Sequence, residues 1–492
     1  MGALCGTFQS GVNKMKMEIH FSFFIRYALL LCMVIWAASC ATQEPAGKKP
    51  TLPEEKSIED YLVIKTPDET PIETSDETPV ETPTETPAEM PSETLEETLT
   101  EAPTETSAET PTEIPVESAD ISVVAEPPKP AIQPPPEPDY LSIVAVGDNL
   151  YHDPMITLIT KKNPVNPVGF YSEIAPLIEN ADIAFVNQET VLAGKDFGYS
   201  GYPQFNTPQN VGEALIATGF NVVNHATNHI MDKGEKAVFA TMDFWDTHPE
   251  IIRLGINRSE ETSNQPVIIE KNNITVGFLS YTYGTNGLPV PKSKPYLVSL
   301  IDTRRIIKDI DALRPNCDLL VVSMHWGEEY RFQPTKEQER LAQLLADHKA
   351  DIIIGHHPHV LEPAVFLTGK EGNTTLCAYS LGNFLSAQAD SPTLLGGMLM
   401  LRIKKHEGMI TIESTGVLPL VTHYETDYTN FKVYPLPTYT DKSAEKHLRA
   451  LQGKDVSVRY FTALANRVLG NMMIENVDMD ETLQPAYTFE KD

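Results

Sequence analysis

Three histidines lie within four residues, directly after a short apolar run in the second half of the chain. The run is Ile352 to Ile354, Gly355 ends it, and His356, His357 and His359 follow. Consecutive isoleucines are typical of a β-strand buried on both faces. Imidazoles crowded at the end of such a strand are costly to bury as bare polar groups. Because neutral imidazole is a common metal ligand, the spacing predicts a metal site.

Side chains of metal-binding type also follow four other apolar, strand-like runs. They are Asp148 after 141–146, Glu189 after 182–186, Asn228 and His229 after 220–223, and His325 after 318–323. In open α/β sheets, ligands bind beyond the carboxyl ends of the strands. Each residue alone is also compatible with turn chemistry. Five strand ends together predict one shared site.

Segments of helical type separate these strands and must position them. They are 171–180, 209–218, 234–248, 303–313 and a segment that starts at Thr335 with the form of a capping box. Alternating strands and helices predict an α/β layered fold. Further strands are expected at 410–413 and 416–420, and further helices at 443–451 and 460–469, without residues of evident chemistry.

The donor set mixes carboxylate, amide and imidazole, and it contains no cysteine. Such a set suits Mn, Fe or Zn better than a structural thiolate zinc site. Its size suits two divalent ions that share a bridging carboxylate and clamp a phosphoryl group for in-line displacement. A histidine outside the metal shell could then protonate the leaving oxygen.

Six ordered blocks between about Leu141 and Leu401 resemble the CapA family of bacterial capsule-synthesis proteins, which is associated with poly-γ-glutamate. The blocks are Gly147-Asp148, Asn187-Gln188-Glu189-Thr190, Asn228-His229 through Gly234, His325-Trp326-Gly327 through Tyr330, Gly355 through Val360, and Tyr379 through Phe384. The family is similar in fold to the calcineurin-type metallophosphoesterases. The resemblance therefore implies a layered β-sandwich flanked by helices, of the metallo-dependent phosphatase type.

The same resemblance implies roles for individual residues. The metal-ligand positions are occupied by Asp148, Glu189, Asn228, His325, His357 and His359. By the same comparison, His229 is the general acid. Phosphoesterases of this type carry Asp-x-His in the first motif, whereas Leu150 stands here at the histidine position. Either His152 substitutes for it or one metal is weakly held, and Glu189 replaces the usual Asp of the second motif.

Three more residues near these motifs have two interpretations each. His356 is either a hydrogen-bonding partner of the ligands or a ligand in place of His357. Asp232 is either a site residue or a charge near a helix N-terminus. Tyr330 is either a packing residue or a contact for a polymeric substrate.

Composition and pattern divide the chain into four parts. Residues 1–40 resemble a signal peptide, because the 12-residue apolar run 27–38 is short for a membrane span. Residues 41–138 form an acidic Glu-Thr-Pro repeat, which predicts a disordered tether. Residues 139–425 are expected to be the CapA-type domain, in which Cys317 and Cys377 could pair or remain thiols. Residues 426–492 are expected to be a helical extension packed on it.

The end of the first part bears on localisation. Ala37-Ala38-Ser39-Cys40 resembles a bacterial lipobox, which implies a lipidated Cys40 and anchoring by several acyl chains. A plain signal peptide and an N-terminal membrane anchor are the alternatives. All three place the domain outside the cytoplasm, with the tether extending into the cell wall.

Charge limits the partners. Residues 41–140 hold 25 acidic and 5 basic residues, so 20 of the 30 net negative charges lie there. Neither this acidic segment nor the rest of the chain offers a basic patch, which disfavours nucleic acid as a partner. The first hypothesis is an extracytoplasmic metallohydrolase for synthesis, release or export of an anionic capsule polymer, cleaving a phosphoester or amide. The alternatives are a non-catalytic polymer-binding subunit of a membrane synthase and a general extracellular metallophosphoesterase.

Overall fold

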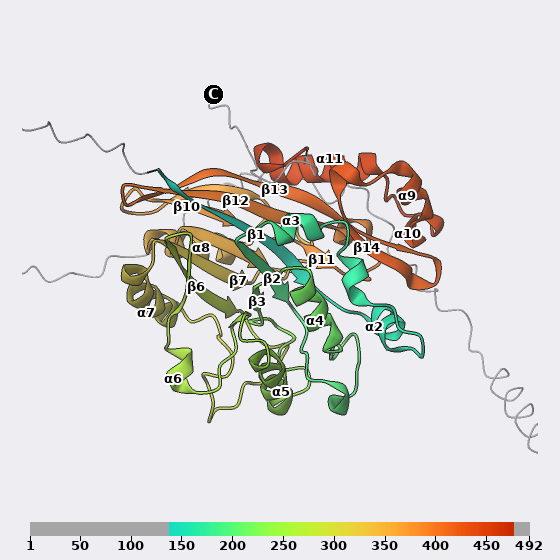
Figure 1. The fold of residues 1–492 in the computed structure, drawn as a ribbon, viewed down its shortest axis with the longest axis horizontal. Helices are drawn as coiled ribbons and strands as arrows, with labels where there is room; N and C mark the ends of the chain where they lie inside the picture. The colour runs from blue at the N-terminus through green and yellow to red at the C-terminus, as the bar shows by residue number, and fades with distance from the viewer. Residues whose placement is uncertain (1–136, 477–492) are drawn as a thin grey trace, which may run out of the picture. The chain divides into compact units, whose positions relative to one another are not determined.

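The computed structural model describes residues 137–476 (Figure 1), and the positions 1–136 and 477–492 lie outside the described residues. The expected signal peptide, the Cys40 lipidation site and almost all of the tether fall among the latter. In the described part, two β-sheets pack together and helices cover them. Among residues 137–476, no helix combines the length and the hydropathy that crossing a bilayer requires.

The larger sheet has eight strands in the order β14-β13-β12-β1-β2-β3-β4, with β11 paired to β1. Its strands are β1 (Asp139–Asn149), β2 (Ile183–Gln188), β3 (Val222–Asn224), β4 (Ile252–Leu254), β11 (Asn383–Leu385), β12 (Leu395–His406), β13 (Met409–Glu425) and β14 (Thr429–Pro435). Strands β1 to β4 run parallel, and β12 to β14 add an antiparallel meander to β1. This arrangement brings the carboxyl ends of β1 and β2 side by side.

The smaller sheet has six strands in the order β5-β6-β7-β8-β10-β9. They are β5 (Val267–Lys271), β6 (Ile274–Thr282), β7 (Leu319–His325), β8 (Ile352–His356), β9 (Ala364–Thr368) and β10 (Thr374–Ala378). Strands β6, β7, β8 and β10 run parallel, and the edge strands β5 and β9 run antiparallel. The carboxyl ends of β7 and β8 are therefore adjacent as well.

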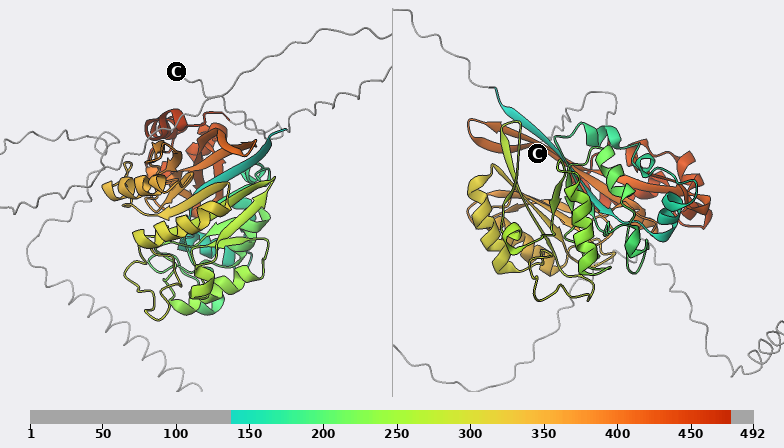
Figure 2. Two further views of the ribbon diagram at one scale, coloured as in Figure 1. Left: turned by 90° about the vertical axis from the view of Figure 1, so that its left-hand side faces the viewer. Right: turned by 60° about the horizontal axis from the view of Figure 1, so that its bottom comes forward.

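The helices surround both sheets (Figures 1 and 2). They are α2 (Asp153–Thr160), α3 (Ala175–Glu179), α4 (Asn210–Ala217), α5 (Glu235–Asp246), α6 (Glu260–Ser263), α7 (Thr303–Leu313), α8 (Lys336–Asp347), α9 (Asp441–Lys446), α10 (Leu448–Leu451) and α11 (Val458–Leu469). The α/β layered fold expected from the sequence is confirmed. The capping box expected at Thr335 is present, since its side chain accepts from the backbone N–H of Gln338.

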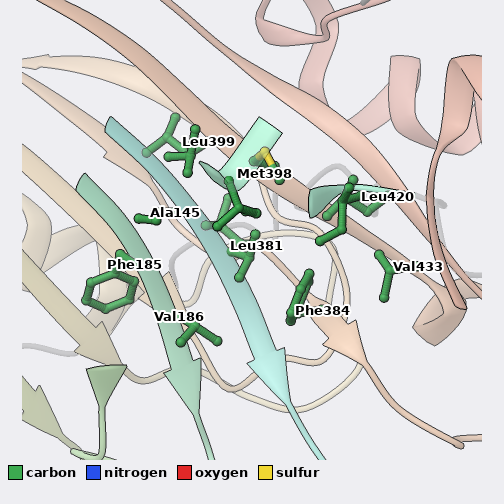
Figure 3. Close-up of a cluster of buried hydrophobic side chains, with 14 of the residues drawn as sticks. Ala145, Phe185, Val186, Leu381, Phe384, Met398, Leu399, Leu420 and Val433 are labelled. Carbon is green, nitrogen blue, oxygen red and sulfur yellow. The ribbon is translucent and has the colours of Figure 1, made fainter. Parts of the chain in front are cut away.

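Side chains of the central strands alternate between two apolar cores. In β7, Leu319 and Val321 belong to the large core that joins the sheets, whereas Leu320 and Val322 belong to a second core under α7 and α8. Figure 3 shows part of the large core, including Phe185 of β2. The apolar runs of the sequence therefore reflect burial on both faces, as expected for parallel strands.

Three expectations about secondary structure need correction. The helix expected over 171–180 is only Ala175–Glu179, because Pro176 is tolerated in the first turn but not inside a helix. The helix expected over 443–451 is two short helices, α9 and α10, separated at His447, whose backbone is extended. The two strands expected over 410–420 are one strand, β13.

The C-terminal segment also differs from the expected helical extension. Strand β14 pairs with β13, so the sheet continues past residue 425. Beyond it, α11 follows, and Ile474 then donates its backbone N–H to Val417 of β13. Of the two alternatives left open for Cys317 and Cys377, the structure shows free thiols. The C-terminal segment is thus part of the same packed unit.

Candidate metal centre

The predicted site residues meet between the two sheets. Asp148 lies near the end of β1, Glu189 follows β2, and His325 and His356 end β7 and β8. Figure 1 shows these strands running toward the same end of the fold. Parallel pairing places the ends of β1 and β2 side by side in one sheet, and the ends of β7 and β8 side by side in the other. The packing of the two sheets then brings these two pairs of strand ends together.

Two groups of donor atoms form at this place. One contains Glu189, His325 and His357, and the other contains Asp148, Glu189 and His359. Within each group one ligand atom from every residue lies within 4.8 Å of the others, and all the residues are buried. Glu189 belongs to both groups, so its carboxylate is shared between them.

The hydrogen bonding around Glu189 tests whether a cation fits here. Both of its carboxylate oxygens are buried, and neither has a hydrogen bond within residues 137–476; the same holds for Nδ1 of His357. Burial, followed by the charge of Asp148 and only partly opposed by His359, raises the pKa of Glu189 well above its usual value. A buried carboxylate without a hydrogen bond is costly. A divalent ion would supply a partner, so the donor set fits a divalent metal.

Asp148 is paired with His359. Nδ1 of His359 lies 3.0 Å from one oxygen of Asp148, and Asn187 donates to the other at 2.8 Å. Burial lowers the pKa of His359, but the nearby Glu189 and the bond to Asp148 outweigh it and raise the pKa to about 9. Conversely, burial raises the pKa of Asp148, and the bond and charge of His359 reverse that and lower it. A metal bound here would compete with a proton on this pair, because ligands bind in their deprotonated form.

The amide of Asn228 reaches the first donor group. Its Oδ1 lies 2.9 Å from Nε2 of His325. Burial, with further contributions from the other histidines, holds the pKa of His325 well below its usual value, and burial lowers that of His357 to about 3. Both imidazoles are therefore neutral, the form that binds metal. The structure thus brings together all six residues predicted as ligands.

His229, predicted as the general acid, is held by Asp232. Nδ1 of His229 lies 2.8 Å from Oδ2 of Asp232, and the backbone N–H of Phe205 donates to the same oxygen at 2.7 Å. Asp232 is 5% exposed and precedes α5, which starts at Glu235. Of the two interpretations of Asp232, the structure favours the site residue, because its carboxylate hydrogen-bonds to His229 and to the backbone of Phe205.

The structure does not bring His152, His356 or Tyr330 into either donor group. His152 lies with Nδ1 3.2 Å from the carbonyl of Leu150, and its ring packs edge-on against Phe205. The ring of His356 stacks on Phe185, with Nδ1 3.9 Å from Asp148. Tyr330 is 48% exposed, and its ring centroid lies 6.1 Å from that of His359. All three surround the donors.

The loop that carries the histidines has an unusual backbone. His357 and His359 have φ of 99° and 59°, in the left-handed region that ordinary residues rarely adopt. Any other residue in place of Gly355 would clash, since a Cβ there would lie 1.8 Å from the carbonyl oxygen of Tyr379. Strained conformations of this kind cost about 1–3 kcal/mol each and cluster at functional sites.

The sequence did not identify three residues of the site. Asn187 donates a hydrogen bond to Asp148 and accepts one from Asn224 at 2.7 Å. In the sequence, the sign that could have identified Asn187 was an amide side chain within the apolar strand β2. Tyr283 is 47% exposed, with its ring 4.7 Å from that of His357, and Asn286 accepts from Asn228 at 3.2 Å. These two follow β6, whose end has no metal-type side chain, so the sequence held no signal for them.

The fold and the site define a class: an α/β sandwich of two sheets with a buried carboxylate and imidazole centre at the strand ends. The model of one family, described as bacterial capsule synthesis protein PGA_cap, matches residues 142–388. That match covers half of the chain, and the chain belongs to this family. The resemblance drawn from the six sequence blocks is confirmed.

Individual relatives agree with this membership. The chain is 29% identical over 273 residues to the PGA biosynthesis protein CapA of Bacillus subtilis (strain 168), which covers 54% of this chain and 69% of the relative. It is 32% identical over 238 residues to the capsule biosynthesis protein CapA of Bacillus anthracis, covering 46% and 56%. The chain thus spans little more than half the length of the second relative.

Among solved structures, the calcineurin-like phosphoesterase YfkN from Bacillus subtilis is similar with a TM-score of 0.35 and 16% identity, covering 57% of this chain and 91% of that chain. This TM-score is low, and the likeness does not bear on the function.

Proposed function

We propose that this protein is a metal-dependent hydrolase of the phosphoesterase type that acts on an anionic capsule polymer, poly-γ-glutamate first of all, during its synthesis, release or export. The observation that carries the proposal is Glu189, a buried carboxylate shared by two donor groups and without a hydrogen bond among residues 137–476. A carboxylate with a purely structural role would not need to be shared by two groups of potential metal ligands. The family membership supports the capsule as the setting.

In this proposal each donor group holds one ion, either Mn, Fe or Zn. Glu189, His325 and His357, with the amide oxygen of Asn228 beside His325, would hold the first ion. Asp148, Glu189 and His359 would hold the second. Ions bound there would supply Lewis-acid polarisation of the scissile group. The protein contributes a buried cradle of carboxylate, amide and imidazole donors.

His229 would deliver the proton to the leaving atom. Because Asp232 accepts from Nδ1, the ring is fixed in one orientation, and its other nitrogen, Nε2, is the one that can serve a substrate. The backbone N–H of Phe205 holds Asp232 in turn, so the proton donor is built on two successive supports.

The test combines metal analysis with turnover on the purified chain. Phosphodiesters, phosphomonoesters and poly-γ-glutamate are offered with and without Mn²⁺, and products are quantified. Turnover that requires metal and is lost in His229→Ala and in His357→Ala supports the enzyme. Metal content should fall only in His357→Ala. His348→Ala, at the C-terminal end of α8 and outside the site, is the matched control that should behave like the wild type.

One observation favours a second candidate, a non-catalytic polymer-binding or scaffold subunit of a membrane synthase. Leu150, 2% exposed, stands where the related phosphoesterases have a histidine, and His152 does not replace it in either donor group. Metal retained without turnover on any substrate class would favour this candidate. Turnover of small phosphoesters but not of the polymer would instead favour a general extracellular metallophosphoesterase.

We also propose that the protein is anchored outside the cytoplasm by lipid on Cys40, with residues 41–138 as its tether into the cell wall, near membrane synthase subunits. The support is the lipobox-like sequence before Cys40 and the acidic repeat that follows it. In a Cys40→Ala variant expressed in a Gram-positive host, the protein should no longer take up labelled fatty acid. It should move from the membrane fraction to the medium or remain unprocessed.

A further inference from the structure

Arg449 of α10 is a buried cation whose partners are all neutral. It is 8% exposed, and its Nε donates to the hydroxyl of Tyr424 at 2.7 Å. Its Nη1 donates to the side chain of Gln452 at 2.7 Å, and its Nη2 to Tyr428 and to the carbonyl of Ala387 at 3.2 and 3.3 Å. Within residues 137–476, none of these acceptors is a carboxylate.

Such an arrangement is unusual, because buried charges are generally paired with opposite charges. The guanidinium lies over the rings of Tyr424 and Tyr428, at 5.5 and 5.6 Å, which offsets part of the cost of its burial. What distinguishes arginine here is its planar fork of donors, which holds several acceptors in one geometry; lysine cannot do this. The position therefore uses arginine as a brace.

Arg449 acts on the segment 386–388, which directly follows β11. Arg449 holds the carbonyl of Ala387, and the hydroxyl of Tyr424, fixed by Arg449, donates to the carbonyl of Gln388 at 2.9 Å. The first strand of this route, β11, pairs with β1 at Asp148, so the segment starts beside a donor residue. Two successive carbonyls are thus held from the C-terminal elements.

The side chain of Gln388 carries the effect to the rim of the site. Its Oε1 accepts from Asn383 at 2.8 Å, and its Nε2 donates to the hydroxyl of Tyr330 at 3.4 Å. The ring of Tyr330 stands beside that of His359, and half of the side chain is exposed. A displacement of Gln388 would therefore release Tyr330, a residue that faces solvent next to the donors.

We propose that Arg449 is a positioning residue that fixes segment 386–388 and thereby holds Gln388 and Tyr330 as a substrate-facing rim beside His359. The position lies beyond residues 142–388, where the family match ends. This assigns a role to the C-terminal segment, which otherwise contains no residue of evident chemistry. The catalytic consequence rests on the proposed function, whereas the positioning itself does not.

The experiment compares Arg449→Lys with the wild type and with Arg459→Lys, an exposed arginine of α11 that serves as the control. The first readout is amide hydrogen exchange of the full chain. Arg449→Lys should accelerate hydrogen exchange of the amides at 386–388 by about tenfold and leave β12 and β13 unchanged. The reason is that the hydrogen bonds to the carbonyls of Ala387 and Gln388 are lost or weakened. Tyr424→Phe removes a single hydroxyl and should act the same way, which protects the test if Arg449→Lys folds poorly.

The second readout is hydrolysis of bis(p-nitrophenyl) phosphate with Mn²⁺. Arg449→Lys should raise KM about fivefold and leave kcat and metal content unchanged, as expected for a lost substrate contact. Adding Gln388→Ala to Arg449→Lys should have little further effect, because both changes act through one route. Unchanged exchange at 386–388, or fully additive effects of the two substitutions, would overturn the proposal. If the wild type shows no turnover, the proposed function fails and exchange alone decides the positioning role.

Discussion

Asp232 accepts a hydrogen bond from Nδ1 of His229 at 2.8 Å, and the same oxygen accepts from the backbone N–H of Phe205 at 2.7 Å. The carboxylate is thus tied to the loop in front of α4 and to the histidine at once. Asp232, three residues after His229 in the sequence, therefore orients the imidazole.

Asp232→Asn should lower kcat by about 10- to 100-fold, because the partner that orients the histidine is lost while the donors are untouched. Bound metal, measured by mass spectrometry, should stay at the wild-type level. Asp311→Asn, on an exposed carboxylate of α7, should have no effect. A variant that lost metal along with activity would show that Asp232 supports the donors rather than His229.

Glu189→Gln should separate the two roles of the shared carboxylate. In EDTA the variant should unfold at a higher temperature than the wild type, because a buried carboxyl group without a hydrogen bond is replaced by a neutral amide. With Mn²⁺ the order should reverse, since a ligand at 100 times its Kd stabilises by about 2.7 kcal/mol and the variant binds poorly. Thermal unfolding with and without metal measures both, with the exposed Glu371→Gln as control. An equal response to Mn²⁺ in both proteins would contradict the bridging position.

His357→Gly should be at least as stable as His357→Ala in the metal-free protein. Glycine normally costs about 0.5–1 kcal/mol relative to alanine, but at φ of 99° it relieves strain of about 1 kcal/mol or more. Urea unfolding in EDTA measures the difference. A glycine variant clearly less stable than the alanine variant would mean that the loop is not strained at this residue.

Glu362 should make stability fall as pH rises. Burial, only partly opposed by the hydrogen bond from Gln338, raises its pKa to about 8, and one oxygen has no hydrogen bond among the described residues. The folded protein therefore binds the proton more tightly than the unfolded chain does. The stabilisation is fully present below the ordinary pKa near 4.5 and is lost as pH rises through about 8.

Glu362→Gln removes this dependence, so the free energies of unfolding of the two proteins should diverge between about pH 5 and pH 8 by a few kcal/mol at most. Denaturant unfolding in EDTA at several pH values provides the comparison. Parallel curves would show that Glu362 is ionised at ordinary pH in the folded protein.

The sequence predicted what depends on local pattern. The candidate donors were found because each stands at or shortly after the end of an apolar strand, and the resemblance to the CapA family then assigned six of them as ligands. The helix expected over 303–313 has those bounds in the structure. What it missed depends on contacts between distant segments. Tyr283 and Asn286 reach the site only because the two sheets pack together. Strand β14 is recognisable as part of the sheet only from its pairing with β13.

The misplaced helix bounds have a simpler cause. Pro176 and the extended backbone at His447 interrupt periodic apolar patterns that continue through them. Apolar spacing reports which face is buried, but it does not report where the backbone changes direction. The roles of His152 and Tyr330 depend on side-chain direction, which no spacing in the chain encodes.

Because one carboxylate belongs to both donor groups, two ions bound there as proposed would not bind independently. An ion held by one group would fix the orientation of Glu189 for the other, and any change in affinity at one position would appear by the same factor at the other. A titration with metal should therefore give a curve that two separate, equal sites cannot describe, and the linkage energy between the ions becomes a direct measure of the bridge.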